Sequence, residues 1–323
     1  MRVETARGPL DTSQLGTTLM HEHIFVLSTE IQQNYPGQWN EDERIADAAA
    51  KLNALKNRGV DTLVDLTVVG LGRDVARIQR LAQKTTLQIV VATGLYTYND
   101  LPLYFHFRGP DTLFGGPETM VDMFVRDITE GIAGTGVKAA MLKCATEAAG
   151  LTPGVERVLR AVAVAHRRTG VPITAHSHSA TYRGRDQQRV FREEGVDLRR
   201  VVIAHAGDST DLAYLRELMD NGSTIGMDRF GIEVMLPFED RVKTVAQLCS
   251  EGYADRMVLS HDASCFLDVF DEEACARLLP KWSYTHIFDD VLPALRQRGV
   301  REEQVRQMLV DNPRRIFEHG GAY

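Results

Sequence analysis

The chain has 323 residues, a hydrophobic content of 44% and a formal net charge of −7. We expect a single domain over residues 1–323, because a chain of this length can bury a large hydrophobic core. The negative net charge and the absence of a basic cluster argue against a nucleic-acid partner. Because no apolar run reaches membrane-spanning length and the N-terminus lacks an apolar signal core, we expect neither membrane insertion nor secretion.

Strand-like and helix-like patterns alternate along the chain. Short β-branched runs predict eight strands, at 17–20, 61–68, 88–95, 139–144, 172–176, 201–205, 223–228 and 256–262. Helical periodicity precedes the second to eighth strands, at 42–58, 74–83, 117–132, 153–168, 187–194, 212–220 and 242–251. Two further helical stretches follow the last strand, at 286–298 and 302–310.

This alternation predicts a parallel sheet, because parallel strands need crossover connections. Eight such units in a chain of this length favour a (β/α)8 TIM barrel. An open doubly wound sheet is the alternative, and it normally carries a glycine-rich phosphate-binding turn after an early strand. Gly70-Leu71-Gly72 follows the second strand but is too short for that motif, so we interpret it as a loop turn.

His21 and His23 form the first candidate site, in the run Leu-Met-His-Glu-His at 19–23. Side chains alternate along a strand, so two imidazoles two residues apart project from the same face. The pair follows the first predicted strand, and a barrel carries its chemistry at that end of its strands. Neutral imidazole is the commonest protein ligand for divalent metals, so the pair indicates a metal site. A solvent-facing pair without a ligand is the open alternative.

Three more strand ends carry residues that bind metals. His176 ends the fifth strand, His205 the sixth and Asp262 the eighth. Parallel strands end at one rim of a barrel, so these side chains should converge with the first pair. One strand-end histidine is usually just a hydrogen-bonded polar group, and only the joint pattern indicates chemistry. No ligand role is assigned to the remaining histidines: His178 in the adjoining loop, His261 on the face opposite Asp262, and His106, His166, His286 and His319 on loops or helices.

Lys143 ends the fourth strand inside the apolar run AAMLKCA. Burying an ammonium is costly. The side chain could avoid that cost by extending to the solvent at the rim or by pairing with an acidic residue. Alternatively, its pKa is lowered and it reacts as a free amine. A free amine can add CO2 and become a carbamate, which is a carboxylate on a long arm. Such a group could bridge two metals.

Charge counting favours this carbamate. Two divalent cations bring four positive charges, of which a carbamate on Lys143, Asp262 and a bridging hydroxide remove three. The remaining positive charge suits an anionic tetrahedral intermediate, whereas an ammonium beside two cations would be repelled. The ligand count permits a second metal without requiring it.

Six motifs resemble those of the phosphotriesterase-like lactonases, which are metal-dependent barrel hydrolases of the amidohydrolase superfamily. They are LMHEH at 19–23, LKCAT at 142–146, AHSH at 175–178, AHAGD at 204–208, GMDRFG at 226–231 and LSHD at 259–262. GLYTYNDLPLYF at 94–105 and DNPRRIF at 311–317 extend the likeness over nearly the whole chain. The resemblance implies a lactone-hydrolysing barrel with a binuclear metal site.

The resemblance also implies how the ligands divide. His21, His23 and Asp262 would hold the more buried metal, His176 and His205 the more exposed one, and carboxylated Lys143 and a hydroxide would bridge them. Zinc is the expected metal, with iron, cobalt or manganese as alternatives, because histidine-plus-carboxylate sites accept all of them. Family members are commonly homodimers, so a homodimer is expected here.

Residues around the metals are carried over in the same way. Tyr96 matches a tyrosine over the bridging hydroxide, and Arg229 matches a residue that shapes the pocket and holds the loop after the seventh strand. Tyr98 either lines the same pocket or packs in the barrel. Phe230 and Phe266 are candidate walls of an apolar acyl pocket, or packing residues. The loop at 266–282 holds the substrate's acyl chain in the family, and its sequence varies.

The predicted reaction is hydrolysis by a metal-bridged hydroxide, because a bound metal lowers the pKa of water to about 7. Asp262 would take the hydroxide proton and pass it to the leaving alkoxide, while the exposed metal and Tyr96 stabilise the oxyanion. Asp208, three residues after His205, either relays protons or orients a ligand, or caps the next helix.

The expected function is hydrolysis of N-acyl-homoserine lactones, a quorum-quenching activity, with weak organophosphate triesterase side activity. A dedicated phosphotriesterase is one alternative, and it would prefer paraoxon-like triesters. A non-catalytic metal-binding barrel is the other, and it would bind metal without hydrolysing esters. The four cysteines show neither metal-finger nor paired spacing, so we expect reduced thiols in a cytoplasmic protein.

Overall fold

Eight parallel strands form the centre of the protein, and the computed structural model describes residues 1–318 and 321–323. In hydrogen-bonded order the strands are β3 (Thr18–Glu22), β5 (Thr62–Asp65), β6 (Gln88–Gly94), β7 (Met141–Thr146), β8 (Ile173–Ser177), β9 (Val201–Ala204), β10 (Thr224–Met227) and β11 (Met257–Leu259). The first and last strands also meet, because Asp262 N donates to His21 O at 3.1 Å and His21 N donates to Ser260 Oγ at 2.8 Å. The predicted (β/α)8 barrel is therefore confirmed.

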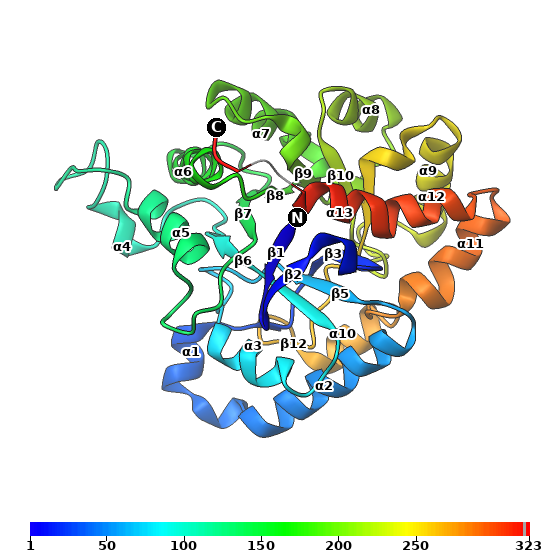
Figure 1. The fold of residues 1–323 in the computed structure, drawn as a ribbon, viewed down its shortest axis with the longest axis horizontal. Helices are drawn as coiled ribbons and strands as arrows, with labels where there is room; N and C mark the ends of the chain where they lie inside the picture. The colour runs from blue at the N-terminus through cyan, green and yellow to red at the C-terminus, as the bar shows by residue number, and fades with distance from the viewer. Residues whose placement is uncertain (319–320) are drawn as a thin grey trace.

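Helices surround these strands in chain order (Figure 1). The longer ones are α2 (Glu41–Asn57), α3 (Val75–Ala82), α5 (Thr119–Thr129), α6 (Pro153–Thr169), α7 (Arg183–Glu193), α8 (Leu212–Asp220) and α9 (Phe238–Ser250). The C-terminal stretch is α11 (Leu292–Gln297), α12 (Glu302–Arg306) and α13 (Asn312–Phe317), with π-helical turns at Ile287–Val291 and Gln307–Asp311. Short helices are α1 (Thr29–Asn34), α4 (Leu103–His106) and α10 (Glu272–Leu278), and 3-10 turns lie at Thr12–Gln14, Pro36–Gln38, Ser179–Thr181, Leu198–Arg200, Ala206–Asp208 and Tyr253–Arg256.

Local sequence signals set the helix ends. Pro153 opens α6 where its missing N–H is harmless, and the Thr152 side chain accepts from Val155 N. The helix ends at Gly170, which has a φ of 77° that a glycine adopts without strain.

Two small sheets were not anticipated from the sequence. A hairpin of β1 (Arg2–Thr5) and β2 (Gly8–Asp11) precedes the barrel. Parallel strands β4 (Phe25–Val26) and β12 (Phe266–Leu267) join the loops after β3 and β11. This second pair ties together the loops that follow His23 and Asp262.

Side chains alternate between the two sides of the barrel wall. One side packs against the helices through Leu63, Ile89, Leu142, Ile173 and Ile203. The other side fills the barrel interior with Val64, Val90, Met141, Val202 and Val258. Alternate residues of a strand share a face, so Lys143 on β7 and His176 on β8 also point into the barrel interior, nearer its C-terminal rim.

A β-bulge in β3 places the first two histidines. The pairing of β3 with β5 shifts by a residue between Leu19 and Glu22. Leu19 packs outward and Met20 inward, and the extra residue then lets His21 face inward as well. His23 follows on the same side, while Glu22 faces outward.

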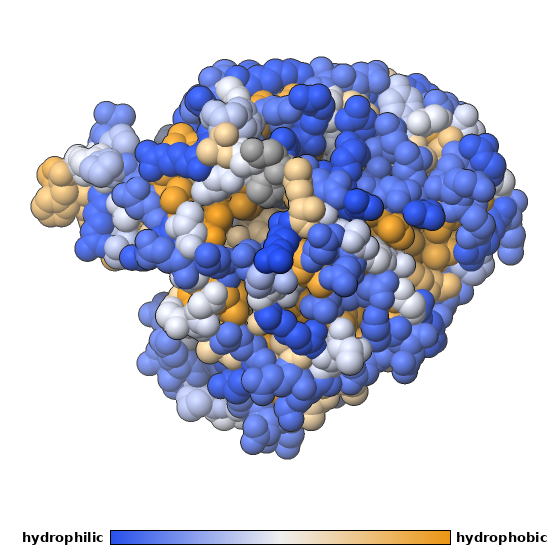
Figure 2. Space-filling model, viewed as in Figure 1, coloured by the Kyte–Doolittle hydropathy of each residue, from blue (hydrophilic) through white to orange (hydrophobic). Residues whose placement is uncertain are grey.

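The surface is mostly polar in the view of Figure 2, with scattered apolar patches, one of them at the tip of the projection around α4. In the loop that follows α4, Leu113 and Phe114 are 77% and 76% exposed. All four cysteines are free thiols. Within residues 1–318 and 321–323, no helix combines the length and apolarity needed to cross a membrane.

Candidate metal centre and active site

The predicted ligands converge at the C-terminal rim of the barrel. His21, His23, Lys143, His176 and His205 are each at most 7% exposed. Nitrogens of His21 and His23 and an oxygen of Asp262 lie within 4.8 Å of one another. His205 and Asp262 adopt left-handed backbone conformations, with φ values of 61° and 55°. Such backbones are costly for residues other than glycine and are typical of functional sites.

Asp228, directly after β10, bonds to two of these histidines. His21 Nδ1 lies 2.8 Å from Asp228 Oδ2, and His205 Nδ1 lies 3.0 Å from Asp228 Oδ1. The backbone N–H of His205 donates to the same Oδ1 at 2.7 Å. Burial lowers the pKa of His21 to about 4 and holds that of His205 well below its usual value, so both rings are neutral. Each ring therefore donates from Nδ1 and carries its lone pair on Nε2.

A hydroxyl fixes His23 in the same way. His23 Nδ1 lies 2.9 Å from Thr67 Oγ1, and that hydroxyl donates to Asp65 Oδ1 at 2.6 Å. Because the Thr67 proton is directed at Asp65, the Thr67 oxygen accepts from His23 Nδ1–H. The lone pair of His23 then lies on Nε2, which is 3.3 Å from Asp262 Oδ1.

Glu147, directly after β7, fixes His176. His176 Nε2 lies 2.8 Å from Glu147 Oε1, and the Tyr96 hydroxyl donates to the same oxygen at 2.7 Å. Burial opposes ionisation of Glu147, but these two hydrogen bonds outweigh it and lower its pKa to about 2. Burial also lowers the pKa of His176, so its neutral ring donates from Nε2 and carries its lone pair on Nδ1.

The lone pairs of all four rings face the same region. His176 Nδ1 and His205 Nε2 are 2.9 Å apart, and His21 Nε2 lies 3.4 Å from Asp262 Oδ1. Two ligand atoms about 2.05 Å from a tetrahedral zinc ion lie roughly 3.3 Å from each other. Lone pairs at such distances repel unless a cation lies between them. This donor set, two nitrogen pairs with a carboxylate, fits divalent metal ions.

Lys143 is buried among these groups. Its Nζ lies 2.8 Å from His21 Nε2 and donates to that lone pair. Burial lowers the pKa of Lys143 to about 8, so a share of its amine is uncharged near neutral pH. The neighbouring strand β6 passes close to the backbone of Lys143, and only glycine fits at position 94, since a Cβ on Gly94 would lie 1.9 Å from Lys143 O.

Arg229 joins Asp262 to Asp208. Its Nε donates to Asp262 Oδ2 and its NH1 to Asp208 Oδ2, both at 3.0 Å. Arg241 pairs with the other oxygen of Asp208 at 2.7 Å. Burial works to raise the pKa of Asp262, but the positive charge of Arg229 opposes it, and that pKa lies well below its usual range.

This geometry narrows the interpretation of Asp208. The helix-cap alternative is wrong, because α8 is capped by Asp211, which accepts from Ala213 N and Tyr214 N. A guanidinium stands between Asp208 and Asp262, and arginine does not give up its proton in proteins. A proton relay through Arg229 is therefore unfavourable, and Asp208 instead holds Arg229 in place.

A cavity with a volume of about 270 Å³ opens above the metal-binding groups. The predicted residues Tyr96, Tyr98 and Arg229 line it, together with apolar side chains Val26, Leu71, Ile232, Val234, Met235, Leu267, Phe270, Leu279 and Trp282. Tyr96 packs edge-on against His176, with ring centroids 5.2 Å apart.

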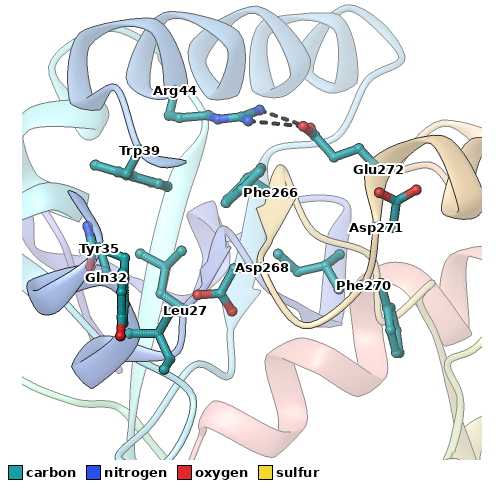
Figure 3. A pocket seen from close by; sticks show the side chains of 12 residues that line it. Leu27, Gln32, Tyr35, Trp39, Arg44, Phe266, Asp268, Phe270, Asp271 and Glu272 are labelled. Carbon is teal, nitrogen blue, oxygen red and sulfur yellow. Dashed lines mark hydrogen bonds and ion pairs between the residues drawn. The ribbon is translucent and has the colours of Figure 1, made fainter. Parts of the chain in front are cut away.

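The two predicted phenylalanine walls lie elsewhere. Phe230 is 1% exposed and packs in the hydrophobic core, not against the cavity. Phe266 lines a neighbouring pocket, where it lies beside Trp39 and under Arg44 (Figure 3). Leu267 and Phe270 line both the pocket and the cavity, which are therefore neighbours.

The other histidines have structural partners. His261 is buried, donates to Glu22 Oε1 at 2.7 Å and accepts from Ile287 N, in accord with the predicted opposite orientation from Asp262. His178 contacts Thr181, and His166 bonds to Val171 O. His106 and His286 pair with Asp100 and Asp290. His319 lies outside the described residues.

Four residues that hold the ligand side chains in place were not identified from the sequence: Asp228, Glu147, Thr67 and Asp65. Asp228 ends the seventh strand as Asp262 ends the eighth, so its position was a usable signal. Glu147 lies four residues after Lys143, at the same rim. Thr67 and Asp65 resemble ordinary polar residues at a strand end, and only the fold brings them to His23.

Comparisons with known proteins agree with this arrangement. The model of the Phosphotriesterase family matches residues 1–317. A phosphotriesterase homology protein of Mycobacterium tuberculosis is 63% identical over 322 residues, which is 99% of each chain. An aryldialkylphosphatase of Saccharolobus solfataricus is 39% identical over 310 residues, covering 95% of this chain and 96% of the relative.

Solved structures give the same result. The phosphotriesterase from Mycobacterium tuberculosis is similar with a TM-score of 0.99 and 63% identity, over 100% of both chains. A structure from the engineering of organophosphate hydrolysis activity on a weak promiscuous lactonase template has a TM-score of 0.90 and 36% identity, over 98% of this chain and 100% of that one. The chain belongs to the phosphotriesterase family.

Proposed function

We propose that this protein is a metal-dependent hydrolase that opens lactone rings, with N-acyl-homoserine lactones as the preferred class and organophosphate triesters as weak substrates. One observation carries the proposal: four buried histidines and Asp262 converge beneath a cavity whose upper lining is largely apolar. A polar reacting ring beside metals and an apolar tail above them suit such a site.

The residues fit two divalent metal ions, with zinc as the expected metal. His21, His23 and Asp262 would hold one, and His176 and His205 the other. Bound there, the metals would polarise the substrate carbonyl and make water a nucleophile at neutral pH. Lys143 would bridge the two after its uncharged amine adds CO2 and releases a proton to give a carbamate.

Asp262 is the proposed proton carrier. Its carboxylate is ionised at neutral pH, because the charge of the Arg229 guanidinium lowers its pKa. It can accept a proton from the attacking water at Oδ1 or Oδ2 and deliver it to the leaving alkoxide of the opened ring. Arg229 donates to Oδ2 at 3.0 Å and so fixes the direction in which the carboxylate faces.

Tyr96 is proposed to orient the substrate carbonyl. Burial and the nearby Glu147 raise the pKa of its phenol, which therefore stays protonated. Its hydroxyl now donates to Glu147 Oε1 at 2.7 Å, so it must turn from that carboxylate to donate to an oxyanion. Tyr98, 64% exposed at the cavity mouth, is placed to contact the substrate's outer part.

A dedicated phosphotriesterase is the second candidate. The 39%-identical relative is named an aryldialkylphosphatase, and this favours triester hydrolysis. The solved structure at 36% identity is described as built on a weak promiscuous lactonase template, which favours lactone hydrolysis with weak triester activity. The two candidates share the metal centre and differ in the substrate that the cavity prefers.

Steady-state kinetics on a substrate panel tests the proposal. Zinc-loaded protein is assayed with N-acyl-homoserine lactones of graded chain length and with paraoxon-like triesters. A higher kcat/KM for the lactones is expected. A higher kcat/KM for the triesters would establish the second candidate, and metal binding without turnover of either class would indicate a non-catalytic barrel.

A further inference from the structure

One buried carboxylate, Asp228, contacts a histidine from each of the two ligand groups. Its Oδ2 lies 2.8 Å from His21 Nδ1, and its Oδ1 lies 3.0 Å from His205 Nδ1. The carboxylate is 1% exposed. The two rings come from β3 and from the end of β9, and their centroids are 4.6 Å apart.

The three contacts of Asp228 require a carboxylate. Its Oδ1 accepts from both the backbone N–H and the Nδ1–H of His205, at 2.7 and 3.0 Å. Its Oδ2 accepts from His21 Nδ1–H. An ionised carboxylate is an acceptor at both oxygens, so it alone satisfies all three donors.

The chain keeps space for this carboxylate. A Cβ added to Gly226 would lie 2.2 Å from Asp228 Oδ2. Gly226 precedes Asp228 by two residues on the same face of β10, so the absence of a side chain there leaves room for Oδ2 beside His21.

We propose that Asp228 is a positioning residue that couples the two metal positions by holding His21 and His205 with their Nε2 lone pairs directed at the metals. This inference rests on the proposed binuclear metal site. It predicts that disturbing one carboxylate oxygen disables one metal position selectively, although Asp228 is not among the proposed metal ligands.

Asp228→Asn makes that selectivity testable. An asparagine oxygen is best placed at the Oδ1 position, where it keeps two hydrogen bonds to His205; the opposite orientation would set the amide NH2 against two donors. The NH2 then faces His21 Nδ1 and stabilises the tautomer with a proton on Nε2. That proton occupies the lone pair that His21 needs to bind a metal.

The experiment measures zinc per chain and zinc affinity on purified full-length protein. Asp228→Asn is expected to retain the His176–His205 position and to lose about 10- to 100-fold in affinity at the His21–His23 position. At limiting zinc the count should fall from two per chain to one. In the Asp228→Asn background, adding His23→Ala should leave one zinc, whereas adding His176→Ala should leave none.

Asp127→Asn is the matched control. Asp127 is also a largely buried carboxylate of the barrel, but it pairs with Thr93 and Arg73 and bonds to none of the histidines that the structure describes. It should keep the wild-type zinc count. Wild-type zinc affinity in Asp228→Asn, or equal loss of both metals, would overturn the proposal that each oxygen of Asp228 positions one histidine. Absence of zinc from wild-type protein would instead overturn the proposed function.

Two measurements keep the proposal testable if Asp228→Asn does not fold. Gly226→Ala retains the charge of Asp228 but displaces Oδ2, so it should weaken the same metal position. In zinc-loaded wild-type protein, nitrogen NMR of labelled histidine should show His21 and His205 protonated on Nδ1. A proton on Nε2 of either ring would contradict the proposal.

Discussion

His176 Nδ1 and His205 Nε2 lie 2.9 Å apart, and each directs a lone pair at the other. The other nitrogen of each ring fixes its tautomer, because His176 Nε2 donates to Glu147 and His205 Nδ1 donates to Asp228. A metal ion placed between the nitrogens removes the repulsion, so metal binding should stabilise the folded protein.

Metal removal is therefore expected to lower stability. Zinc at 100 times its dissociation constant adds about 2.7 kcal/mol per site to the free energy of unfolding, provided that the unfolded chain does not bind it. Thermal unfolding of chelator-treated and zinc-loaded protein measures the difference. Identical midpoints in the two samples would contradict a metal site at this position.

Asp262→Asn is expected to abolish turnover at saturating zinc. Asparagine keeps the size of the side chain and an oxygen ligand but cannot carry the proton, and such proton transfer contributes about 10²- to 10⁴-fold. The measurement is kcat for lactone hydrolysis at zinc concentrations that saturate the variant. Asp208→Asn is the comparison, because Asp208 reaches Asp262 only through Arg229 and should affect kcat less. A near-normal kcat in Asp262→Asn would rule out its assigned role.

Lys143 tests the carbamate. Lys143→Ala should lower activity, and short carboxylic acids added with zinc should restore part of it by entering the space left by the side chain. Lys143→Met keeps the length and apolar bulk of the side chain but cannot react with CO2, so it should be inactive. Full activity of Lys143→Met would show that no carbamate is needed.

His261 gives the protein a pH-dependent stability that is separate from metal ligation. Burial lowers its pKa to about 3 in the folded state, whereas an unfolded histidine has a pKa of about 6.5. Between these values the unfolded chain binds a proton that the folded one does not, so the free energy of unfolding falls as the pH drops. The slope from this residue is up to about 1.4 kcal/mol per pH unit.

Urea unfolding of metal-free protein from pH 6.5 down to 4.5 measures this slope, with His261→Gln as the matched variant. The variant should be less stable at pH 6.5, because it loses the contacts with Glu22 and Ile287, but its stability should fall less steeply with acid. Parallel curves for the two proteins would show that His261 is not the neutral, buried group described above.

The strand ends were predictable because the chemistry of the barrel lies at one rim. Apolar runs locate β7, β8 and β9, and the polar residue that ends each run then points to Lys143, His176 and His205. Alternation alone does not explain β3, where a bulge after Leu19 turns His21 inward. A bulge reverses which side chains point inward along the rest of the strand, but it leaves no mark in the hydrophobic pattern of the sequence.

The residues that hydrogen-bond to the metal-binding histidines were harder to predict from the sequence. Asp228 and Glu147 are acidic residues at strand ends, and only the fold shows that they contact His21, His205 and His176. For Phe230 the sequence left two alternatives, a wall of the pocket or packing, and the structure places it in the core. Which side a loop residue faces depends on backbone angles that one sequence does not reveal.

The most direct test of a catalytic binuclear metal centre is a zinc titration of metal-free protein, followed by the rate at which it opens an N-acyl-homoserine lactone ring. Hydrolysis should be negligible without metal, and the rate should rise until about two equivalents of zinc per chain are bound. Full hydrolysis before zinc is added would contradict such a centre.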